Sequence, residues 1–318
     1  MMYILLLIIL IAAQLAYFRL AIHYNIVDKP NERSSHKYHT LRGGGIIFYI
    51  GVLLFFIISK FEYPWFFLGL TFISIISFVD DVKQISPKLR IIIQFAGILL
   101  LFLQADFFTL PWYIIIVALI VCVGILNAFN FMDGINGITG IYSLVVIGAL
   151  LYIDTFIVHY VDKHIIYVSI LSLFVFNFFN FRTRAKCFAG DVGAVTIAFI
   201  ILFLLGSLIF VTRDFSYIVL LAVYGVDTVL TIVHRIILKE HILEPHRKHL
   251  FQLLANEKKI PHLLVSTLYA LLQLLIFVGL LIFRNHGTIY MIAVVIILSI
   301  VYIVVKRRIS FGLIVGSL

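Results

Sequence analysis

Long runs of apolar residues, separated by short polar segments, make up nearly the whole chain. A helix needs about 20 apolar residues to cross the hydrocarbon core of a bilayer. Backbone groups in lipid must bond within their own segment, and no ten-residue alternating pattern indicates a barrel, so we expect helices. The runs predict eleven spans, near residues 2–22, 44–60, 63–80, 89–105, 110–127, 135–153, 164–180, 193–212, 215–234, 263–283 and 287–305.

Composition supports an integral membrane protein. Of 318 residues, 63% are hydrophobic and 12% are charged, whereas soluble domains are nearer half apolar and a quarter charged. The first run lacks a preceding basic segment and a small-residue cleavage site, so we expect a retained helix. Cys122 and Cys187 lie far apart and predict no disulfide framework. We find no soluble domain, repeat or low-complexity segment, and predict one transmembrane domain over residues 1–318.

The basic residues are distributed unevenly over the predicted loops. With the N-terminus outside and alternating spans, 19 of the 24 Lys and Arg residues fall on one side. The positive-inside rule makes that side cytosolic, together with the C-terminus. The predicted cytosolic loops cover residues of about 23–43, 81–89, 128–134, 181–192 and 235–262. Topology and contact with anionic lipid explain most of these bases, and their dispersal argues against nucleic-acid binding. They do not explain carboxylates placed beside the bases at span ends.

Two cytosolic segments near the start of the chain combine acids, bases and glycines. Residues 28–36 contain Arg-Ser-Ser-His and lead to Arg42 and Gly43–Gly45 at the start of the second span. The glycines could let backbone N–H groups approach a phosphate, or could allow close helix packing, and both interpretations stay open. Asp80 and Asp81 end the third span, with Lys83 close by. Adjacent carboxylates repel unless a cation compensates them, so we favour function over simple helix capping.

A third polar segment contains Asn127, Asn130, Asp133 and Asn136. A spacing of three residues predicts that they line one side of a helix end, either facing a cleft or forming an interhelical hydrogen-bond seam. A fourth segment runs from Asn180 through several bases to Asp191 in a Gly-Asp-Val-Gly turn. Asp191 could cap the next helix, or could hold Mg²⁺ with phosphate oxygens as further ligands.

The last segment is Pro-His-Arg-Lys-His-Leu at residues 245–250. His246 and His249 could share a zinc ion, but no third ligand stands at a usual spacing. A cationic cluster that binds a diphosphate, with Arg247, suits these residues better. Asp227 lies deep in a span, and it is either a buried partner of Arg235 or without assigned role.

Taken in order, these five segments resemble the polyprenyl-phosphate N-acetylhexosamine-1-phosphate transferases, also called glycosyltransferase family 4. The resemblance covers about residues 28–255, and five motifs on one membrane face are specific where any single one is weak. It implies transfer of a sugar-1-phosphate from a UDP-amino sugar to undecaprenyl or another polyprenyl phosphate, with release of UMP. It also implies Mg²⁺, with Mn²⁺ as an alternative, a bacterial inner-membrane location, a cytosolic active site and a homodimer. Both direct attack and an aspartyl intermediate are considered for the family.

The resemblance assigns roles to the motif residues. The expected catalytic residues are Asp80, Asp81 and Asp133. The expected metal ligands are Asp191 and Asp81. The expected substrate-binding residues are Arg42, Lys83, Asn127, Asn130, Asn180, His246, Arg247 and His249.

Two departures from the family pattern matter. The muramoyl-pentapeptide branch has consecutive histidines where this chain has His-Arg-Lys-His, which favours the GlcNAc or deoxy-amino-sugar branch. Asn136 stands where many relatives have Asp, so a catalytic role there is in doubt. The alternative function is a transporter or flippase for a phosphorylated solute, which should carry polar groups and broken helices near the bilayer midplane. A lipid-phosphate phosphatase would need a nucleophile–His pairing that we do not find.

Overall fold

The computed structural model describes residues 1–28, 39–241 and 246–315, with side chains through Ile309. The Arg-Ser-Ser-His segment lies outside these residues. The long helices are α1 (Met2–His23), α3 (Pro64–Val82), α4 (Pro87–Gln104), α5 (Trp112–Met132), α6 (Ile138–Phe156), α7 (Lys163–Asn180), α8 (Gly190–Thr212), α9 (Ala222–Ile237), α11 (His262–Ile282) and α12 (Gly287–Val315). The short elements are α2 (Ile46–Ile58), α10 (Leu250–Gln252), the 3₁₀ turns Phe107–Thr109, Phe215–Leu221 and Arg284–His286, a π-helical turn Leu253–Glu257, and strands β1 (Val27–Asp28) and β2 (Thr40–Leu41).

The prediction of a helical polytopic membrane protein is confirmed. Within the described part of the chain, ten helical segments are long and apolar enough to cross a membrane. The remaining predicted span, 44–60, forms the 13-residue helix α2, which is shorter than these ten. Predicted boundaries mostly agree to within a few residues, although α5 extends to Met132 and α12 to Val315.

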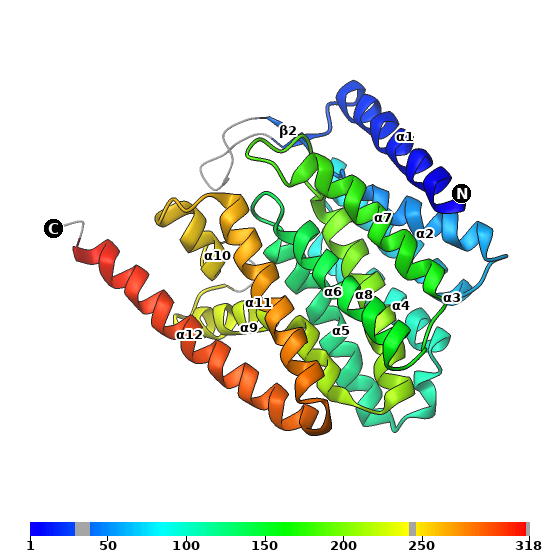
Figure 1. The fold of residues 1–318 in the computed structure, drawn as a ribbon. Coiled ribbons are helices and arrows are strands. Elements are labelled where there is room, and N and C mark those ends of the chain that lie inside the picture. Colours follow the sequence, from blue (N-terminus) through cyan, green and yellow to red (C-terminus); the bar gives the residue numbers. More distant parts are fainter. Residues whose placement is uncertain (29–38, 242–245, 316–318) are drawn as a thin grey trace.

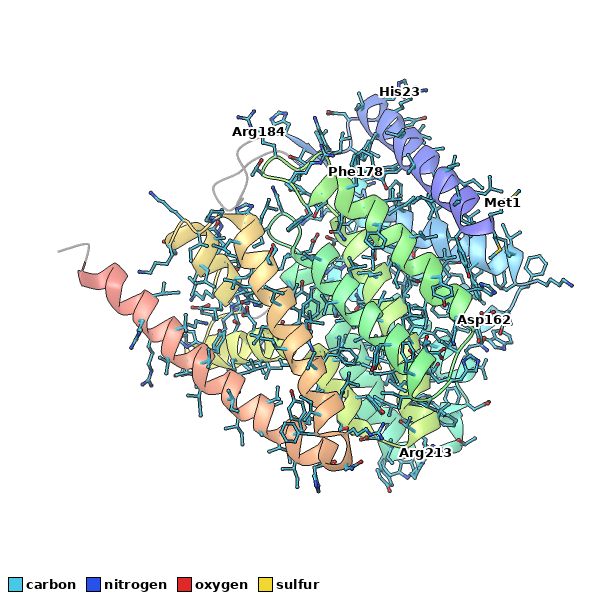
Figure 2. The ribbon with its side chains drawn as sticks, viewed as in Figure 1. Met1, His23, Asp162, Phe178, Arg184 and Arg213 are labelled. Atoms are coloured by element: carbon cyan, nitrogen blue, oxygen red, sulfur yellow. The ribbon has the colours of Figure 1, made fainter. Side chains whose placement is uncertain are left out.

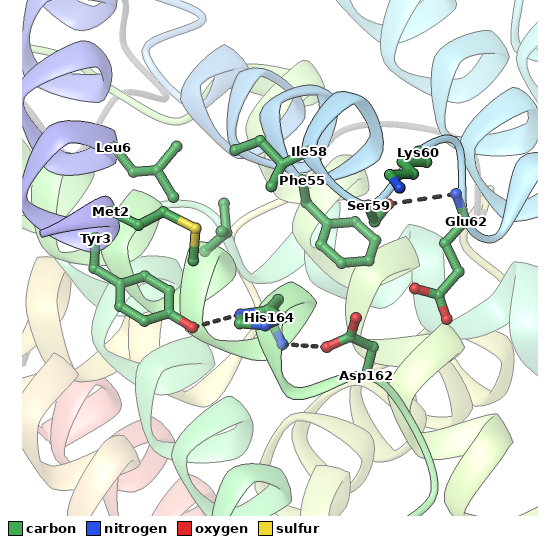
Figure 3. Close-up of a pocket in the computed structure, with 11 residues that line it drawn as sticks. Met2, Tyr3, Leu6, Phe55, Ile58, Ser59, Lys60, Glu62, Asp162 and His164 are labelled. Atoms are coloured by element: carbon green, nitrogen blue, oxygen red, sulfur yellow. Dashed lines mark hydrogen bonds between the residues drawn. The ribbon is translucent and has the colours of Figure 1, made fainter.

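Helix α2 still connects the two ends of the bundle although it is short. Its first residue follows the Gly43–Gly45 turn, which lies against the start of α8. Its last residues line a cavity of about 280 Å³ together with the first residues of α1 and of α7 (Figure 3). Because this cavity lies at the opposite end, the helices alternate in direction as predicted.

Helix α8 forms the centre of the bundle (Figure 1). Nearly every residue from Val192 to Leu205 is buried, and the helix contacts α2, α3, α5 and α6. A helix that is apolar on all sides is stable only when neighbours or lipid cover it completely. By contrast, α1, α5 and α12 bury less than a third of their most apolar window and expose the rest at the edge of the bundle. This ordering places the first turn of α8 among the ends of other helices.

The longer connections gather at one end of the bundle. Figure 2 places His23 and Arg184 near this end, and Met1, Asp162 and Arg213 near the other. Strands β1 and β2 pair antiparallel at the first end, and Leu41 also bridges to Cys187 in the loop before α8. The predicted cytosolic loops therefore lie together, although the bundle alone does not orient them in a cell.

Candidate active site

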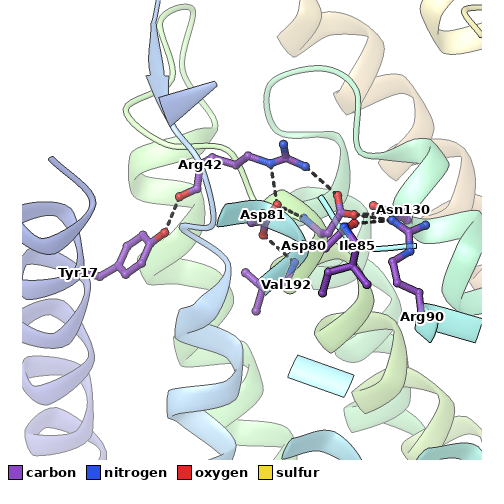
Figure 4. Close-up of polar contacts among 9 residues, drawn as sticks. Tyr17, Arg42, Asp80, Asp81, Ile85, Arg90, Asn130 and Val192 are labelled. Atoms are coloured by element: carbon purple, nitrogen blue, oxygen red, sulfur yellow. Dashed lines mark hydrogen bonds and ion pairs between the residues drawn. The ribbon is translucent and has the colours of Figure 1, made fainter. Parts of the chain in front are cut away.

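Arg42 joins two helices at the loop-rich end of the bundle. Its Nε donates to Asp81 Oδ1 at 2.6 Å, and its Nη2 donates to Asp191 Oδ1 at 3.2 Å (Figure 4). Asp81 ends α3, and Asp191 stands in the first turn of α8. Burial disfavours the charge of Arg42, but these carboxylates and that of Asp28 outweigh it and raise the pKa of the guanidinium. Arg42 is therefore held as a cation between the two helix ends.

The glycine turn after Arg42 explains how this position is fixed. The N–H groups of Gly44 and Gly45 donate to backbone carbonyls of residues 188 and 189, at 2.8 and 3.0 Å. A Cβ atom on Gly45 would lie 2.2 Å from the Cα of Gly193. Both amides are thus used within the protein, which supports the close-packing interpretation of the glycines over a phosphate cradle. The Tyr17 hydroxyl also donates to the Arg42 carbonyl at 2.5 Å.

Asp81 accepts hydrogen bonds from the start of α8. Its Oδ1 accepts the N–H of Asp191 at 2.9 Å, and its Oδ2 accepts the N–H of Val192 at 3.0 Å. The first N–H groups of a helix have no partner within it and carry partial positive charge, so a carboxylate from another helix stabilises them. Asp81 thus caps α8 from α3, across 110 residues of sequence.

Asp80 and Arg90 complete the group. Arg90, in the first turn of α4, donates from Nη1 to Asp80 Oδ2 at 2.5 Å and to Asp191 Oδ2 at 3.0 Å. Asn130 of α5 also reaches Asp191 Oδ2, at 3.4 Å. We call Arg42, Asp80, Asp81, Arg90 and Asp191 the arginine–aspartate network. Its three carboxylates exceed its two guanidinium groups by one negative charge.

Arg90 is the residue that sequence reasoning missed. The sequence places Arg90 only among the 19 Lys and Arg residues on the predicted cytosolic side, because no motif includes it. The available signal was its position. Arg90 stands one turn into α4, which follows α3 after a four-residue connection. By contrast, Lys83, an expected substrate-binding residue, lies exposed beyond the end of α3 and outside the network.

The prediction that four polar residues line one side of a helix end is only partly correct. Helix α5 ends at Met132, so Asp133 and Asn136 leave the helical face predicted for them. Asn127 donates to Gln94 Oε1 at 2.9 Å within the bundle, and Asn136 donates to the carbonyls of residues 182 and 183. Only Asn130 reaches the network directly. The physical reason is that a turn at Gly134–Gly137 redirects the chain before the fourth residue of the stripe.

Asp133 directly follows the last residue of α5. Its Oδ1 accepts the Thr139 hydroxyl at 2.7 Å. Burial raises the pKa of the Asp133 carboxyl to about 6, while the Thr139 hydrogen bond opposes the rise. Asn180, an expected substrate-binding residue, makes two internal hydrogen bonds: its Oδ1 accepts the N–H of Gly137, and its Nδ2 donates to the Cys187 carbonyl, each at 2.8 Å. Asn180 therefore joins two loops at this end.

The histidine loop, residues 246–252, packs beside the end of α5. The rings of His246 and His249 stack at 5.0 Å between centroids, and Phe131 lies 6.3 Å from His249. Burial, with nearby His249 and Arg235, lowers the pKa of His246 to about 4. Among the described residues, no three His, Cys, Asp or Glu side chains gather as a metal site.

The fold and the site together define a polytopic helical membrane protein whose charged residues from several helices meet at one end of the bundle. A family model described as glycosyl transferase family 4 matches residues 63–209. That segment contains Asp80, Asp81, Asp133 and Asp191, whereas Arg42 and the histidine loop lie outside it.

Curated relatives point the same way. The chain is 31% identical over 259 residues to "Probable undecaprenyl-phosphate N-acetylglucosaminyl 1-phosphate transferase" of Bacillus subtilis (strain 168), covering 73% of this chain and 70% of that protein. Undecaprenyl-phosphate alpha-N-acetylglucosaminyl 1-phosphate transferases of Yersinia pestis and Escherichia coli K12 are 31% and 30% identical. These alignments cover 59% and 57% of this chain, and 56% and 54% of the relatives' lengths. The chain belongs to glycosyl transferase family 4.

Arg90→Ala is expected to lower turnover in the assay described below by roughly a hundredfold, because one charge that compensates both Asp80 and Asp191 is lost. The measurement is initial rate with purified protein at saturating substrates. Lys88→Ala is the matched control, since Lys88 is exposed on the same first turn of α4. Equal rates for the two variants would show that Arg90 contributes only to the orientation of the protein in the membrane.

Proposed function

We propose that the protein transfers an N-acetylhexosamine 1-phosphate from a UDP-sugar to undecaprenyl or another polyprenyl phosphate. UMP is released, and the lipid-linked sugar would start the synthesis of a cell-surface polysaccharide. The observation that carries this proposal is the arginine–aspartate network, which joins α3, α4 and α8 at one end of a membrane bundle. A lipid phosphate and a water-soluble diphosphate can meet only at such a boundary. The names of the similar proteins support the same reaction.

The net reaction exchanges one phosphoanhydride partner for another. An oxygen of the lipid phosphate forms a bond to the β-phosphorus of the UDP-sugar. The bond from that phosphorus to the oxygen bridging to the α-phosphate breaks, and UMP departs with the bridging oxygen. Phosphoryl transfer depends mainly on positioning and on neutralising charge. Arg42 and Arg90 are suited to the second task, Asp133 is the proposed base, and Asp80 and Asp81 would hold the two arginines in place.

A divalent metal fits the residues present. Arg90 Nη1 lies 2.5 Å from Asp80 Oδ2 and 3.0 Å from Asp191 Oδ2, so both carboxyl groups contact the same guanidinium nitrogen, and the network carries excess negative charge. Mg²⁺ prefers oxygen ligands and takes one or two carboxylates with substrate phosphates. We propose that Asp191 and Asp80 would hold Mg²⁺, or Mn²⁺, because both Asp81 oxygens already accept backbone N–H groups. When bound, the ion would neutralise charge on the diphosphate and the leaving UMP.

The remaining substrate contacts are proposed from position. Asn130 reaches Asp191, and the loop containing His246, Arg247 and His249 packs next to the end of α5. These residues would bind the nucleotide and the diphosphate from the side opposite to Arg42. Lys83 lies exposed just after α3, so it would contact the substrate only while the substrate enters the site. The internal hydrogen bonds of Asn127 and Asn180 suit a supporting task instead.

We propose that the N-terminus lies outside, that the loop-rich end is cytosolic, and that the membrane is a bacterial inner membrane. The concentration of Lys and Arg in these loops supports this orientation. Residues 1–318 would form a single transferase domain, and the family resemblance suggests a homodimer. A transporter is not favoured, because the carboxylates of the network lie at one end of the bundle instead of midway along it.

An in vitro assay tests the function directly. Purified protein, polyprenyl phosphate and Mg²⁺ are mixed with each of a panel of UDP-amino sugars, and both UMP and the lipid product are measured. We expect Mg²⁺-dependent UMP release in equal amount to a lipid-linked sugar, with at least one of UDP-GlcNAc and the UDP-deoxy-amino sugars. If no donor yields lipid product, the protein is not such a transferase.

A further inference from the structure

Asp227 is a buried carboxylate that the proposed reaction does not use. It lies in α9, and 3% of its surface is exposed. The expected partner Arg235 contacts Glu240, with 3.2 Å between Nε and Oε2. Asp227 Oδ1 instead lies 3.3 Å from His249 Nδ1 and accepts the N–H of Leu250 at 3.0 Å, while Oδ2 accepts the Tyr269 hydroxyl at 2.7 Å. The carboxylate thus faces the histidine loop.

The two ring nitrogens of His249 have different surroundings within the described part of the chain. The ring is 1% exposed and lies between His246 and Phe251, at 5.0 and 5.9 Å between centroids. Its Nε2 has no hydrogen-bond partner among the residues that the structure describes. A buried polar atom left unpaired is destabilising, so proteins retain one mainly where a ligand or water completes it.

The two nitrogens of an imidazole are linked through its tautomer. A carboxylate beside Nδ1 accepts the proton held there and fixes the ring orientation, while an imidazole that carries two protons donates from both nitrogens. In that form Nε2 is a donor as well, and it can make a charge-assisted hydrogen bond to an anionic oxygen. Asp227 therefore determines what His249 can bind, although Asp227 itself is turned away from that ligand.

The surroundings of His249 point to a phosphate oxygen. Phe131, in contact with the His249 ring, is adjacent in sequence to Asn130, which reaches Asp191 in the arginine–aspartate network. Phe251, two residues after His249, packs against Gly134 in the turn after Asp133. The histidine loop thus packs against Phe131 and Gly134, and these two residues belong to the same short segment as Asn130, which contacts the network.

We propose that Asp227 is a positioning residue, which orients His249 so that Nε2 donates to a diphosphate oxygen of the nucleotide sugar. This inference rests on the proposed transferase function and adds a residue to it. The lipid phosphate has no part in this contact. Loss of the Asp227 charge should therefore weaken use of the UDP-sugar and leave use of the polyprenyl phosphate unchanged.

The test compares Asp227→Asn, His249→Ala and the double variant. Asn has nearly the same shape and keeps an acceptor for Nδ1 but removes the charge. We expect KM for the UDP-sugar to rise about tenfold in each single variant, the size expected when a charge-assisted hydrogen bond is lost, with KM for polyprenyl phosphate within about twofold of the wild type. If Asp227 acts through His249, the double variant should be no worse than His249→Ala alone.

The matched control is Asp154→Asn. Asp154 is 2% exposed, accepts the backbone N–H groups of Tyr160 and Val161, and faces His159 Nδ1 at 3.1 Å. It thus has the same kind of environment at the opposite end of the bundle. We expect this variant to lose thermal stability to a similar degree as Asp227→Asn and to keep both KM values.

Two separate readouts keep the inference distinct from the proposed function. UMP release by the wild type decides the function. The rise in Tm that the UDP-sugar alone produces, with no lipid substrate, decides the role of Asp227. At the same UDP-sugar concentration it should be unchanged in Asp154→Asn and clearly smaller in Asp227→Asn and His249→Ala than in the wild type. An unchanged rise in Asp227→Asn, an equal increase of both KM values, or additive effects in the double variant would overturn the inference.

Discussion

Asp191→Asn is expected to reduce UMP release by roughly a thousandfold, the largest loss from any single isosteric change in the protein. Asp191 is the one carboxylate that contacts both arginines of the network, at 3.2 and 3.0 Å, and it is the proposed principal metal ligand. An asparagine keeps the shape and can still accept from Arg42 or Arg90, but it removes the negative charge that a divalent cation requires. The measurement is single-turnover product formation at saturating Mg²⁺.

Stability is the control for this result. The Asp191 side chain is not an acceptor for the first N–H groups of α8, since Asp81 serves them, so Tm should change by no more than about 2 °C. Asp106→Asn is the matched variant, because Asp106 is an exposed aspartate in the connection before α5, at the other end of the bundle. Asp191→Asn turning over at more than a tenth of the wild-type rate would refute the role proposed for Asp191.

Gly45→Ala is expected to destabilise the protein by about 3 kcal/mol and to lower activity at least tenfold. The added Cβ would lie 2.2 Å from the Cα of Gly193 and 3.0 Å from the Ala189 carbonyl oxygen. Neither is the end of a flexible side chain, so the turn must move away from α8. Arg42, three residues earlier, would then lose its geometry towards Asp81 and Asp191.

The matched change is Gly124→Ala in α5, where a Cβ would meet nothing within 4 Å. There the substitution should be neutral or slightly stabilising, because alanine has the better helix propensity. Thermal unfolding of both variants in the same detergent, followed by the UMP assay, checks the prediction. Equal stability of Gly45→Ala and the wild type would mean that the turn does not press against α8 as tightly as the structure places it.

Several features of the site could be anticipated because they depend on local sequence. Asp80, Asp81 and Asp191 each stand at the end of an apolar run, and the runs alternate in direction, so all three had to lie at one membrane face. The pairing between them could not be anticipated. It depends on which helices become neighbours and on their rotation about their own axes, and both are decided by packing between distant segments.

Three residues illustrate this limit. Arg90 belongs to no motif, and only the packing of α4 beside α3 and α8 brings it to Asp80 and Asp191. The sequence suggests for Asp227 either a pairing with Arg235 or no assigned role. In the structure the histidine loop packs against α9, and His249 pairs with Asp227. Asn136 was placed on a helical stripe, but a turn after Met132 directs it to a loop carbonyl.

From its sequence alone, this protein is a helical membrane protein with a charged face, because hydrophobicity and the number of residues needed to span a bilayer act on each segment separately. The family resemblance also rests on motifs that are readable along the chain. Only the tertiary structure decides that Asp81 caps α8, that two arginines bridge three aspartates, and that His249 has one nitrogen paired and one without a partner among the described residues. These contacts join residues from 10 to 149 positions apart, and they form only when the helices pack.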